Sequence, residues 1–272
     1  MQPPQNPYGQ TPNPYGQPQQ PYQQQPYQQF TPSPQQPRGT VSLDVIGEAW
    51  ALVKPQIVPY ILALLIAGAI IFGVGMVIGI IQVPFAPRTA GERPGAGYFA
   101  VSFLAQILNA GVQGVVAAAV YRMAIAHVRT GQANISEMFS ATDVLAPALL
   151  AGVLVYLATV IGFILLIIPG IIASLGLAMT QPLIADQRLQ AVDAMKASWE
   201  KMKGNLGSYF VLGLVLGLIN LGGALLCGLG LLVTVPMTIL ANALVYRDLF
   251  GTQNQAPPTG GYTPPPIANP NF

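Results

Sequence analysis

The sequence predicts an all-α integral membrane protein with about six transmembrane helices arranged as three hairpins. Hydrophobic residues make up 52% of the 272-residue chain and charged residues only 7%, whereas an ordinary soluble domain is about a quarter charged. Between the two ends of the chain, four long and mostly apolar intervals contain no charge, and each is longer than the roughly 20 apolar residues that one helical span needs. These intervals are residues 55–87, 94–121, 144–185 and 204–246.

The two ends of the chain differ in composition from the middle. Residues 1–40 are rich in Pro, Gln and Tyr, repeat the motifs NPYGQ and QPY, and carry Arg38 as their only charge. Frequent proline removes backbone donors and few apolar residues remain for a core, so we expect a disordered cytoplasmic tail. Residues 251–272 have the same character. The predicted membrane domain is therefore residues 41–250.

Six spans follow from the hydropathy of this domain, and two breaks need a physical reason. The sequence IIPG at 167–170 and the glycine-rich stretch at 222–230 each interrupt a run too long for one helix. Proline removes a helical hydrogen bond and glycine permits a sharp turn, which favours a tight hairpin at both places. The alternative is one long kinked helix at either place, which would leave an odd number of spans. The predicted spans are residues 57–83, 98–122, 146–168, 170–186, 207–225 and 229–246.

The basic residues predict the orientation, because positively charged loops stay on the cytoplasmic side. With both termini inside, only Arg88 and Arg93 of the eleven Lys and Arg residues fall outside. The expected location is the inner (cytoplasmic) membrane, crossed several times, with cytoplasmic N- and C-termini. The basic residues expected inside are Arg38, Lys54, Arg122, Arg129, Arg188, Lys196, Lys201, Lys203 and Arg247.

A short amphipathic segment precedes each predicted hairpin, which is typical of a helix lying in the membrane interface. These segments are centred on residues 43–54, 135–139 and 189–203, the middle one being the weakest. The first and third agree in register, and their hairpins both end in Val-Tyr-Arg, at 120–122 and 245–247. Either the chain repeats one unit of interfacial helix plus hairpin three times, or chance and interface chemistry alone produced the match. The aromatic and basic side chains expected to anchor in the headgroup layer are Trp50, Lys54, Tyr60, Trp199, Lys203 and Tyr209.

A further set of residues recurs in a pattern known from other membrane proteins: Ile167-Ile168-Pro169-Gly170, Pro182, Asp186, Ala194, Ser198 and Lys203-Gly204-Asn205. With these residues the chain resembles a broad group of bacterial polytopic membrane proteins, which includes the membrane domain fused to some glycerophosphodiester phosphodiesterases and many members with no assigned function. The resemblance covers residues 41–250 and implies a helical membrane domain; no phosphodiesterase domain is present, so that activity is not implied. The tyrosine- and proline-rich N-terminus is similar to those of actinobacterial membrane proteins.

Amide side chains form the most suggestive polar group within the spans. Gln106, Asn109 and Gln113 are three and four residues apart and therefore share one face of the second span. The cluster could line a polar path or bind a headgroup, or it could join helices at about 0.6 kcal/mol for each interhelical hydrogen bond. The amides on other spans that could meet it are Gln181, Asn220 and Asn242.

Small residues and prolines also recur within the spans. Gly75 and Gly79, and likewise Gly213 and Gly217, are four residues apart, which allows helices to approach closely either inside the monomer or between copies. Pro182 and Pro236 are expected to kink the fourth and sixth spans.

The sequence gives little support for an enzymatic function. The single histidine, His127, has no partner constellation and is expected in an interfacial loop, and the single cysteine, Cys227, lies in an apolar turn. The sequence contains neither a metal-ligand motif nor a phosphate-binding glycine loop, so we expect no catalytic residue, cofactor or metal. A net charge of +2 without a basic tract argues against a nucleic-acid partner.

The leading functional hypothesis is a non-enzymatic scaffold or accessory subunit of a membrane complex. Its expected partners are membrane lipids and other membrane or cytoplasmic proteins, the proteins being recruited through the N-terminal tail, and self-association is open. The alternative is a permease or channel for a small apolar or lipid-like solute. Coupled ion transport is disfavoured, because no ionisable residue lies inside a span.

Overall fold

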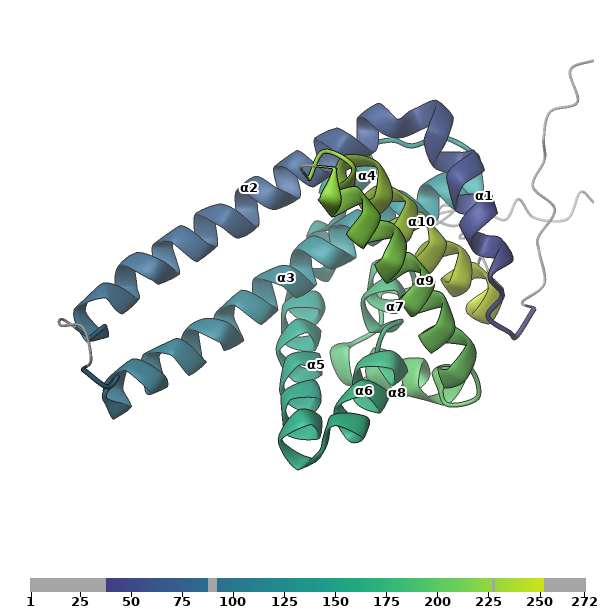
Figure 1. Ribbon diagram of the computed structural model, residues 1–272. Helices are drawn as coiled ribbons and strands as arrows, with labels where there is room; N and C mark the ends of the chain where they lie inside the picture. The colour runs from purple at the N-terminus through teal and green to yellow at the C-terminus, as the bar shows by residue number, and fades with distance from the viewer. Residues whose placement is uncertain (1–37, 88–91, 227, 252–272) are drawn as a thin grey trace, which may run out of the picture. The chain divides into compact units, whose positions relative to one another are not determined.

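The computed structural model describes residues 38–87, 92–226 and 228–251, and every regular element in these ranges is a helix (Figure 1). Six helical stretches are long and apolar enough to cross a membrane, as predicted. Large apolar side chains cover their outer faces; Phe72, Ile164 and Leu225 are each at least 74% exposed. An apolar exterior of this kind suits lipid and not water, so the chain is a multi-pass membrane protein. The predicted disordered tails lie outside the described residues.

The helices follow one another in three units, each a short segment followed by a hairpin. The first unit is α1 (Asp44–Val53), α2 (Ile57–Gln82) and α3 (Ala96–Thr130). The second is α4 (Ser136–Phe139), the 3-10 turn η3 (Ser140–Val144), α5 (Leu145–Leu165), α6 (Ile167–Gly176) and α7 (Thr180–Gln187). The third is α8 (Ala191–Met202), α9 (Leu206–Leu225) and α10 (Leu231–Phe250). The 3-10 turns η1 (Lys54–Gln56) and η2 (Val83–Phe85) flank α2.

The predicted hairpin near Ile167 is present, but its turn lies at Leu166, which is extended (φ −167°, ψ 159°). Pro169 sits in the first turn of α6, where a missing N–H breaks no helical bond. Gly170, which follows this proline, does not form the turn. It allows α5 and α6 to pack closely, because a Cβ at Gly162 would lie 2.9 Å from the Gly170 Cα. The glycine-rich break before α10 also forms a hairpin, with Gly228 in a left-handed conformation (φ +77°). Cys227 lies outside the described residues.

The fourth span differs most from its prediction. It is broken between Gly176 and Thr180, and the buried Ser198 on α8 holds the break: its Oγ donates to the Gly176 oxygen (2.8 Å) and accepts from the Met179 N–H (3.2 Å). Pro182 falls in the first turn of α7, so the expected kink inside one continuous helix is wrong. Pro236 does lie inside α10, which continues through it.

The two longer amphipathic helices turn mostly small and medium-sized residues toward the bundle. In α1 the buried positions are Val45, Ala49 and Val53, whereas Trp50 is exposed. In α8 the buried set is Ala191, Ala194, Ser198 and Met202. These faces let the two helices lie close against the spans and leave Trp50 exposed toward the membrane interface.

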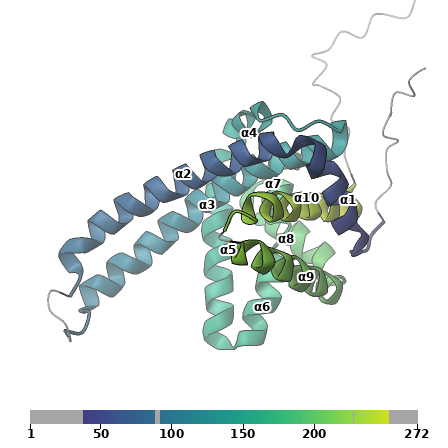
Figure 2. The same cartoon turned by 45° about the horizontal axis from the view of Figure 1, so that its top comes forward.

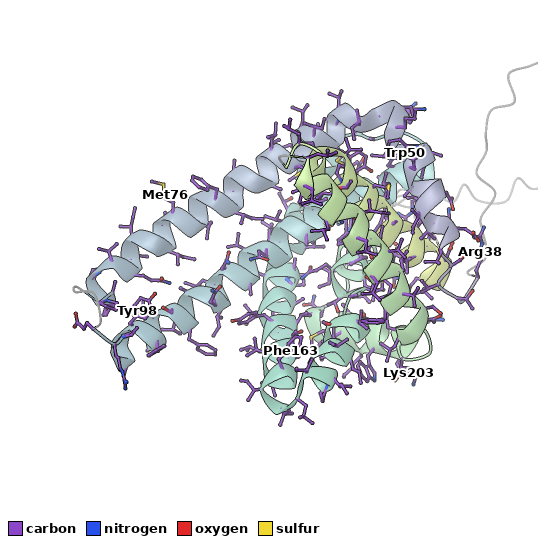
Figure 3. The ribbon with its side chains drawn as sticks, viewed as in Figure 1. Arg38, Trp50, Met76, Tyr98, Phe163 and Lys203 are labelled. Carbon is purple, nitrogen blue, oxygen red and sulfur yellow. The ribbon has the colours of Figure 1, made fainter. Side chains whose placement is uncertain are left out.

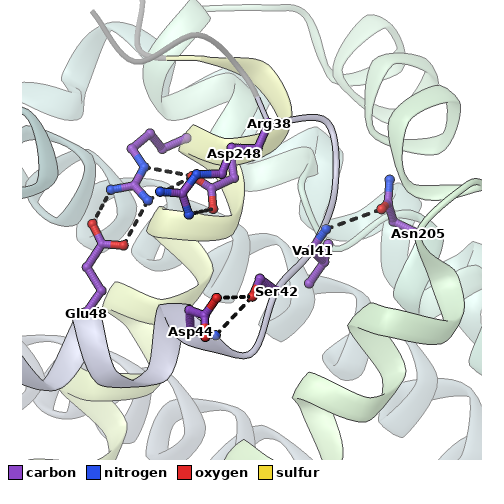
Figure 4. A network of polar contacts seen from close by, with 8 residues as sticks. Arg38, Val41, Ser42, Asp44, Glu48, Asn205 and Asp248 are labelled. Carbon is purple, nitrogen blue, oxygen red and sulfur yellow. Dashed lines mark hydrogen bonds and ion pairs between the residues drawn. The ribbon is translucent and has the colours of Figure 1, made fainter. Parts of the chain in front are cut away.

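Ion pairs link the closing helix of one unit to the short segment of another. Arg122 at the end of the first hairpin contacts Asp143 in η3 (2.6 Å). Arg247 at the end of the third contacts Glu48 in α1, so the last unit is tied back to the first. Figure 4 shows that network, in which Arg247 also binds its neighbour Asp248 (2.8 Å). The arginine of each Val-Tyr-Arg motif therefore links its hairpin to the short segment of another unit.

The core lies around α3 and α10, and α3 contacts α2, α5, α7 and α10. Figures 1 and 2 both show α2 beside α3, and α5 beside α6; α5 packs against the middle of α3. Toward their far ends α2 and α3 carry mostly outward apolar side chains; Met76, labelled in Figure 3, is 61% exposed. The central part of α3 is therefore where polar side chains of several spans can meet.

Candidate functional site

An open groove of about 470 Å³ lies between α3, α5 and α7, at the middle of the spans. Close approach of two helices forms it: a Cβ at Gly152 of α5 would lie 2.3 Å from the Ala110 oxygen of α3. A Cβ at Gly114 would likewise lie 2.5 Å from the Ala148 oxygen. Only glycine allows this contact, because both obstacles are backbone atoms. The groove is lined by Gln106, Asn109, Ala110, Gln113, Gly114, Ala117, Gly152, Val155, Tyr156, Thr159 and Gln181.

Four of the six predicted amides meet in this groove. Gln106, Asn109 and Gln113 come from one face of α3, as their spacing predicts, and Gln181 comes from the second position of α7. The Gln181 Nε2 donates to the Ala148 oxygen (3.2 Å) and fills the space that a side chain on Gly114 would need. The broken fourth span thus sets the position of Gln181, since α7 starts just before it.

Two acceptors in the groove residues are buried without a hydrogen-bond partner among the described residues. They are the side-chain oxygens of Asn109 and Gln181. Leaving a buried amide oxygen unpaired costs about 1–3 kcal/mol. Both oxygens are covered in the structure, so a bound molecule would recover this free energy once the amide side chains turn toward the groove. No charged side chain lines the groove. It is therefore suited to a neutral group with hydroxyl or amide donors attached to an apolar body.

Sequence reasoning missed the hydroxyl side of the groove. Tyr156 and Thr159 of α5 line it opposite the amides of α3. They are three residues apart and share one helical face, which was the available signal. Hydroxyl side chains in an otherwise apolar span also commonly hydrogen-bond to the backbone of their own helix, so the spacing by itself is weak evidence for a binding site.

The other two predicted amides lie outside the groove and join α9 to α10. The Asn220 Nδ2 donates to the Thr238 Oγ1 (2.8 Å). The Asn242 Oδ1 accepts from the Tyr209 hydroxyl (2.7 Å). For these two residues the structure supports the interpretation as interhelical contacts.

The six expected interfacial anchors are not equivalent in the structure. Trp50 and Lys54 are exposed, and Lys203 pairs with Glu200 (2.5 Å) at the surface. Trp199 is 39% exposed, with its ring against α6 at a glycine. Tyr209 is half-buried in the contact described above.

Tyr60 is completely buried and contacts His127, with 3.0 Å between its hydroxyl oxygen and the His127 Nδ1. His127 is also fully buried, inside α3, so its expected loop position is wrong: α3 continues to Thr130. A tyrosine near the end of a hydrophobic run looks the same in sequence whether it faces the headgroups or a neighbouring helix.

Within the described ranges no group of three or more His, Cys, Asp or Glu residues could hold a metal ion. The chemistry that the groove offers is neutral hydrogen bonding with apolar contact.

Comparisons with known proteins give relatives but no activity. No family model and no solved structure matches the chain. It is 32% identical over 125 residues to the uncharacterised protein Rv2560 of Mycobacterium tuberculosis and to the uncharacterised protein Mb2590 of Mycobacterium bovis. The alignment covers 44% of this chain and 38% of each relative, so the chain matches well under half of their length. The resemblance to the membrane domain of glycerophosphodiester phosphodiesterases stays a prediction.

Proposed function

We propose that this protein is a non-enzymatic membrane protein that binds a lipid-like or small amphipathic solute in the groove between α3, α5 and α7 and passes it along the membrane or across it. The observation that carries the proposal is the pair of unpaired buried oxygens, on Asn109 and Gln181, in a groove of about 470 Å³. A binding function accounts for a polar arrangement at membrane depth that helix packing alone leaves unsatisfied.

The lining favours a particular ligand chemistry. Amides and hydroxyls stand on two walls and apolar residues on the rest, so the ligand carries a neutral hydrogen-bonding end and an apolar remainder. An ionised ligand would have to lose its hydration without gaining a counter-charge in the groove. Gln106 and Gln113 are exposed at the sides of the groove, where a molecule already dissolved in the bilayer would first meet them.

The test is flux or exchange of amphipathic solutes in liposomes that contain the full chain. Changing Gln106, Asn109 and Gln113 together to leucine should abolish the flux while the protein stays folded. Asn220→Leu is the matched control, because it removes a buried amide that lies outside the groove. Undiminished flux in the triple variant would contradict the proposal, and so would an equal loss of flux in the Asn220→Leu control.

A second candidate, an accessory subunit of a membrane complex, is favoured by the outward glycines. A Cβ added at Gly75, Gly79, Gly213 or Gly217 would meet nothing within 4 Å, so these pairs do not pack within the described part of the chain. Such surfaces suit another transmembrane helix, from a partner or a second copy. Deleting residues 1–39 should abolish co-purification of cytoplasmic partners while insertion is retained; unchanged co-purification would count against this candidate.

We also propose an inner-membrane location with both termini in the cytoplasm. The support is the distribution of basic residues together with the contact between the two described ends of the membrane domain, where the Gly39 N–H donates to the Asp248 oxygen (2.9 Å). Reporter fusions at each terminus test this orientation. Opposite reporter activities would contradict it.

A further inference from the structure

A second cavity, separate from the groove, lies where α3 and α7 end and the α4–η3 segment crosses them. It is open on one side and has a volume of about 200 Å³. Arg122 is nine residues beyond Gln113 on α3, about 13 Å along the helix axis, so this cavity lies nearer the membrane surface than the groove. The residues that line it are Arg122, Ile125, Ala126, Arg129, Glu137, Ser140, Ala185, Asp186 and Arg188.

One of its three arginines is fully used by the fold. The two terminal nitrogens of Arg122 contact the Asp143 carboxylate (2.6 and 3.3 Å). Its Nη1 also donates to the Ser140 oxygen (2.6 Å) and its Nε to the Ala185 oxygen (3.0 Å). Arg122 therefore holds the cavity wall together and has little capacity left for a ligand.

The other two arginines have donors that the fold does not use. Arg129 contacts Asp186 through Nη2 (2.5 Å), while its Nε, which is buried, has no hydrogen-bond partner among the described residues; the Arg129 side chain as a whole is 23% exposed. Arg188, which lines the cavity, contacts Asp143 through Nε (2.7 Å), and its side chain is 61% exposed. Arg188 is also the one non-glycine residue of the described ranges with a positive φ (54°), a costly conformation that often marks functional positions.

The cavity also holds an unused negative charge. Glu137 of α4 lines it and makes no ion pair within the described part of the chain. A simple anion would be attracted by Arg129 and Arg188 but repelled by Glu137. A ligand carrying both a phosphate and an ammonium group satisfies all three side chains.

We propose that this cavity binds a phosphoethanolamine-type zwitterion, with the phosphate against Arg129 and Arg188 and the ammonium against Glu137. Arginine suits the phosphate, because its planar fork of donors matches two phosphate oxygens. A primary ammonium donates hydrogen bonds to a carboxylate, whereas a quaternary ammonium is recognised by an aromatic cage, and no aromatic residue lines the cavity. The position at the helix ends matches the depth of phospholipid headgroups.

The test is a binding titration of the purified full chain in detergent. The probes are short-chain phosphatidylethanolamine, phosphatidylcholine and phosphatidylglycerol, with soluble glycerophosphoethanolamine and inorganic phosphate as competitors. We expect the ethanolamine lipid to bind best, and Glu137→Gln and Arg188→Gln each to weaken it about tenfold, since a hydrogen bond to a charged group contributes about that factor. Glu200→Gln and Lys201→Gln on α8 are the matched controls and should leave binding unchanged.

The outcomes test the proposed zwitterion site and also distinguish a soluble ligand from a membrane lipid. Competition by glycerophosphoethanolamine equal to that of the lipid would support the zwitterion site with a soluble ligand; a strong preference for the lipid would support a membrane headgroup. Phosphatidylglycerol binding best, or Glu137→Gln leaving ethanolamine binding intact, would overturn the proposal. Should Arg188→Gln fail to fold because it also pairs with Asp143, the Glu137→Gln variant carries the test, since Glu137 makes no ion pair in the described structure.

Discussion

The contact between α3 and α5 provides a quantitative test of the groove. In Gly152→Ala the new Cβ would lie 2.3 Å from the Ala110 backbone oxygen and 3.0 Å from the Gly114 Cα. Ordinary contact begins at about 3.4 Å, so α3 and α5 must separate by about 1 Å, because no side chain can move aside. Overpacking of this kind costs about 1–3 kcal/mol. The separation should also weaken solute binding in the groove.

The control is Gly75→Ala on α2, where an added Cβ meets nothing within 4 Å. That change should be neutral or stabilise by up to about 1 kcal/mol through helix propensity. The assay is the free energy of unfolding in a detergent titration, measured for both variants alongside solute binding. Equal stability of Gly152→Ala and Gly75→Ala would refute the close approach of α3 and α5.

Three further predictions concern helix contacts outside the groove. Arg247→Gln removes the partner of Glu48, whose side chain is 37% exposed, and should loosen α1 by about 1 kcal/mol, the upper end for a pair that water still screens; faster hydrogen exchange in α1 measures it, and unchanged exchange would contradict the link. Gly176→Ala would bring its Cβ within 2.4 Å of the Trp199 ring, so it should destabilise the protein by about 1–3 kcal/mol, and a double variant with Trp199→Leu should recover much of the loss in the same detergent titration. Tyr209→Phe removes one hydrogen bond between α9 and α10 and should cost about 0.6 kcal/mol; a loss of several kcal/mol would indicate a larger role for the hydroxyl.

Hydropathy predicted most of the fold because each span must be apolar on its own. The three hairpins and the short segments before them follow from runs of residues that are adjacent in sequence. The break in the fourth span does not, since Ser198 on α8 supplies its hydrogen bonds from a distance. Pro169 and Pro182 were read as turn and kink residues, yet both occupy first turns of helices, where proline costs no hydrogen bond.

The candidate site was predictable along one helix but not between helices. The spacing of Gln106, Asn109 and Gln113 placed them together on α3, and the structure brings them to one groove. Periodicity says nothing about which helices are neighbours, so it could not separate Gln181, which joins the groove, from Asn220, which does not. The arginine cavity was missed for the same reason: its ion pairs join three helical segments that are far apart in sequence.

Photo-crosslinking in native membranes tests the binding groove most directly. A photoreactive benzoylphenylalanine in place of Tyr156 would stand in the groove, and the same residue in place of Phe210, which is 41% exposed on α9, would face lipid. After irradiation, mass spectrometry of the purified protein should find a discrete amphipathic adduct at position 156 and only the bulk phospholipid mixture at position 210. The same bulk mixture at both positions would contradict a binding groove.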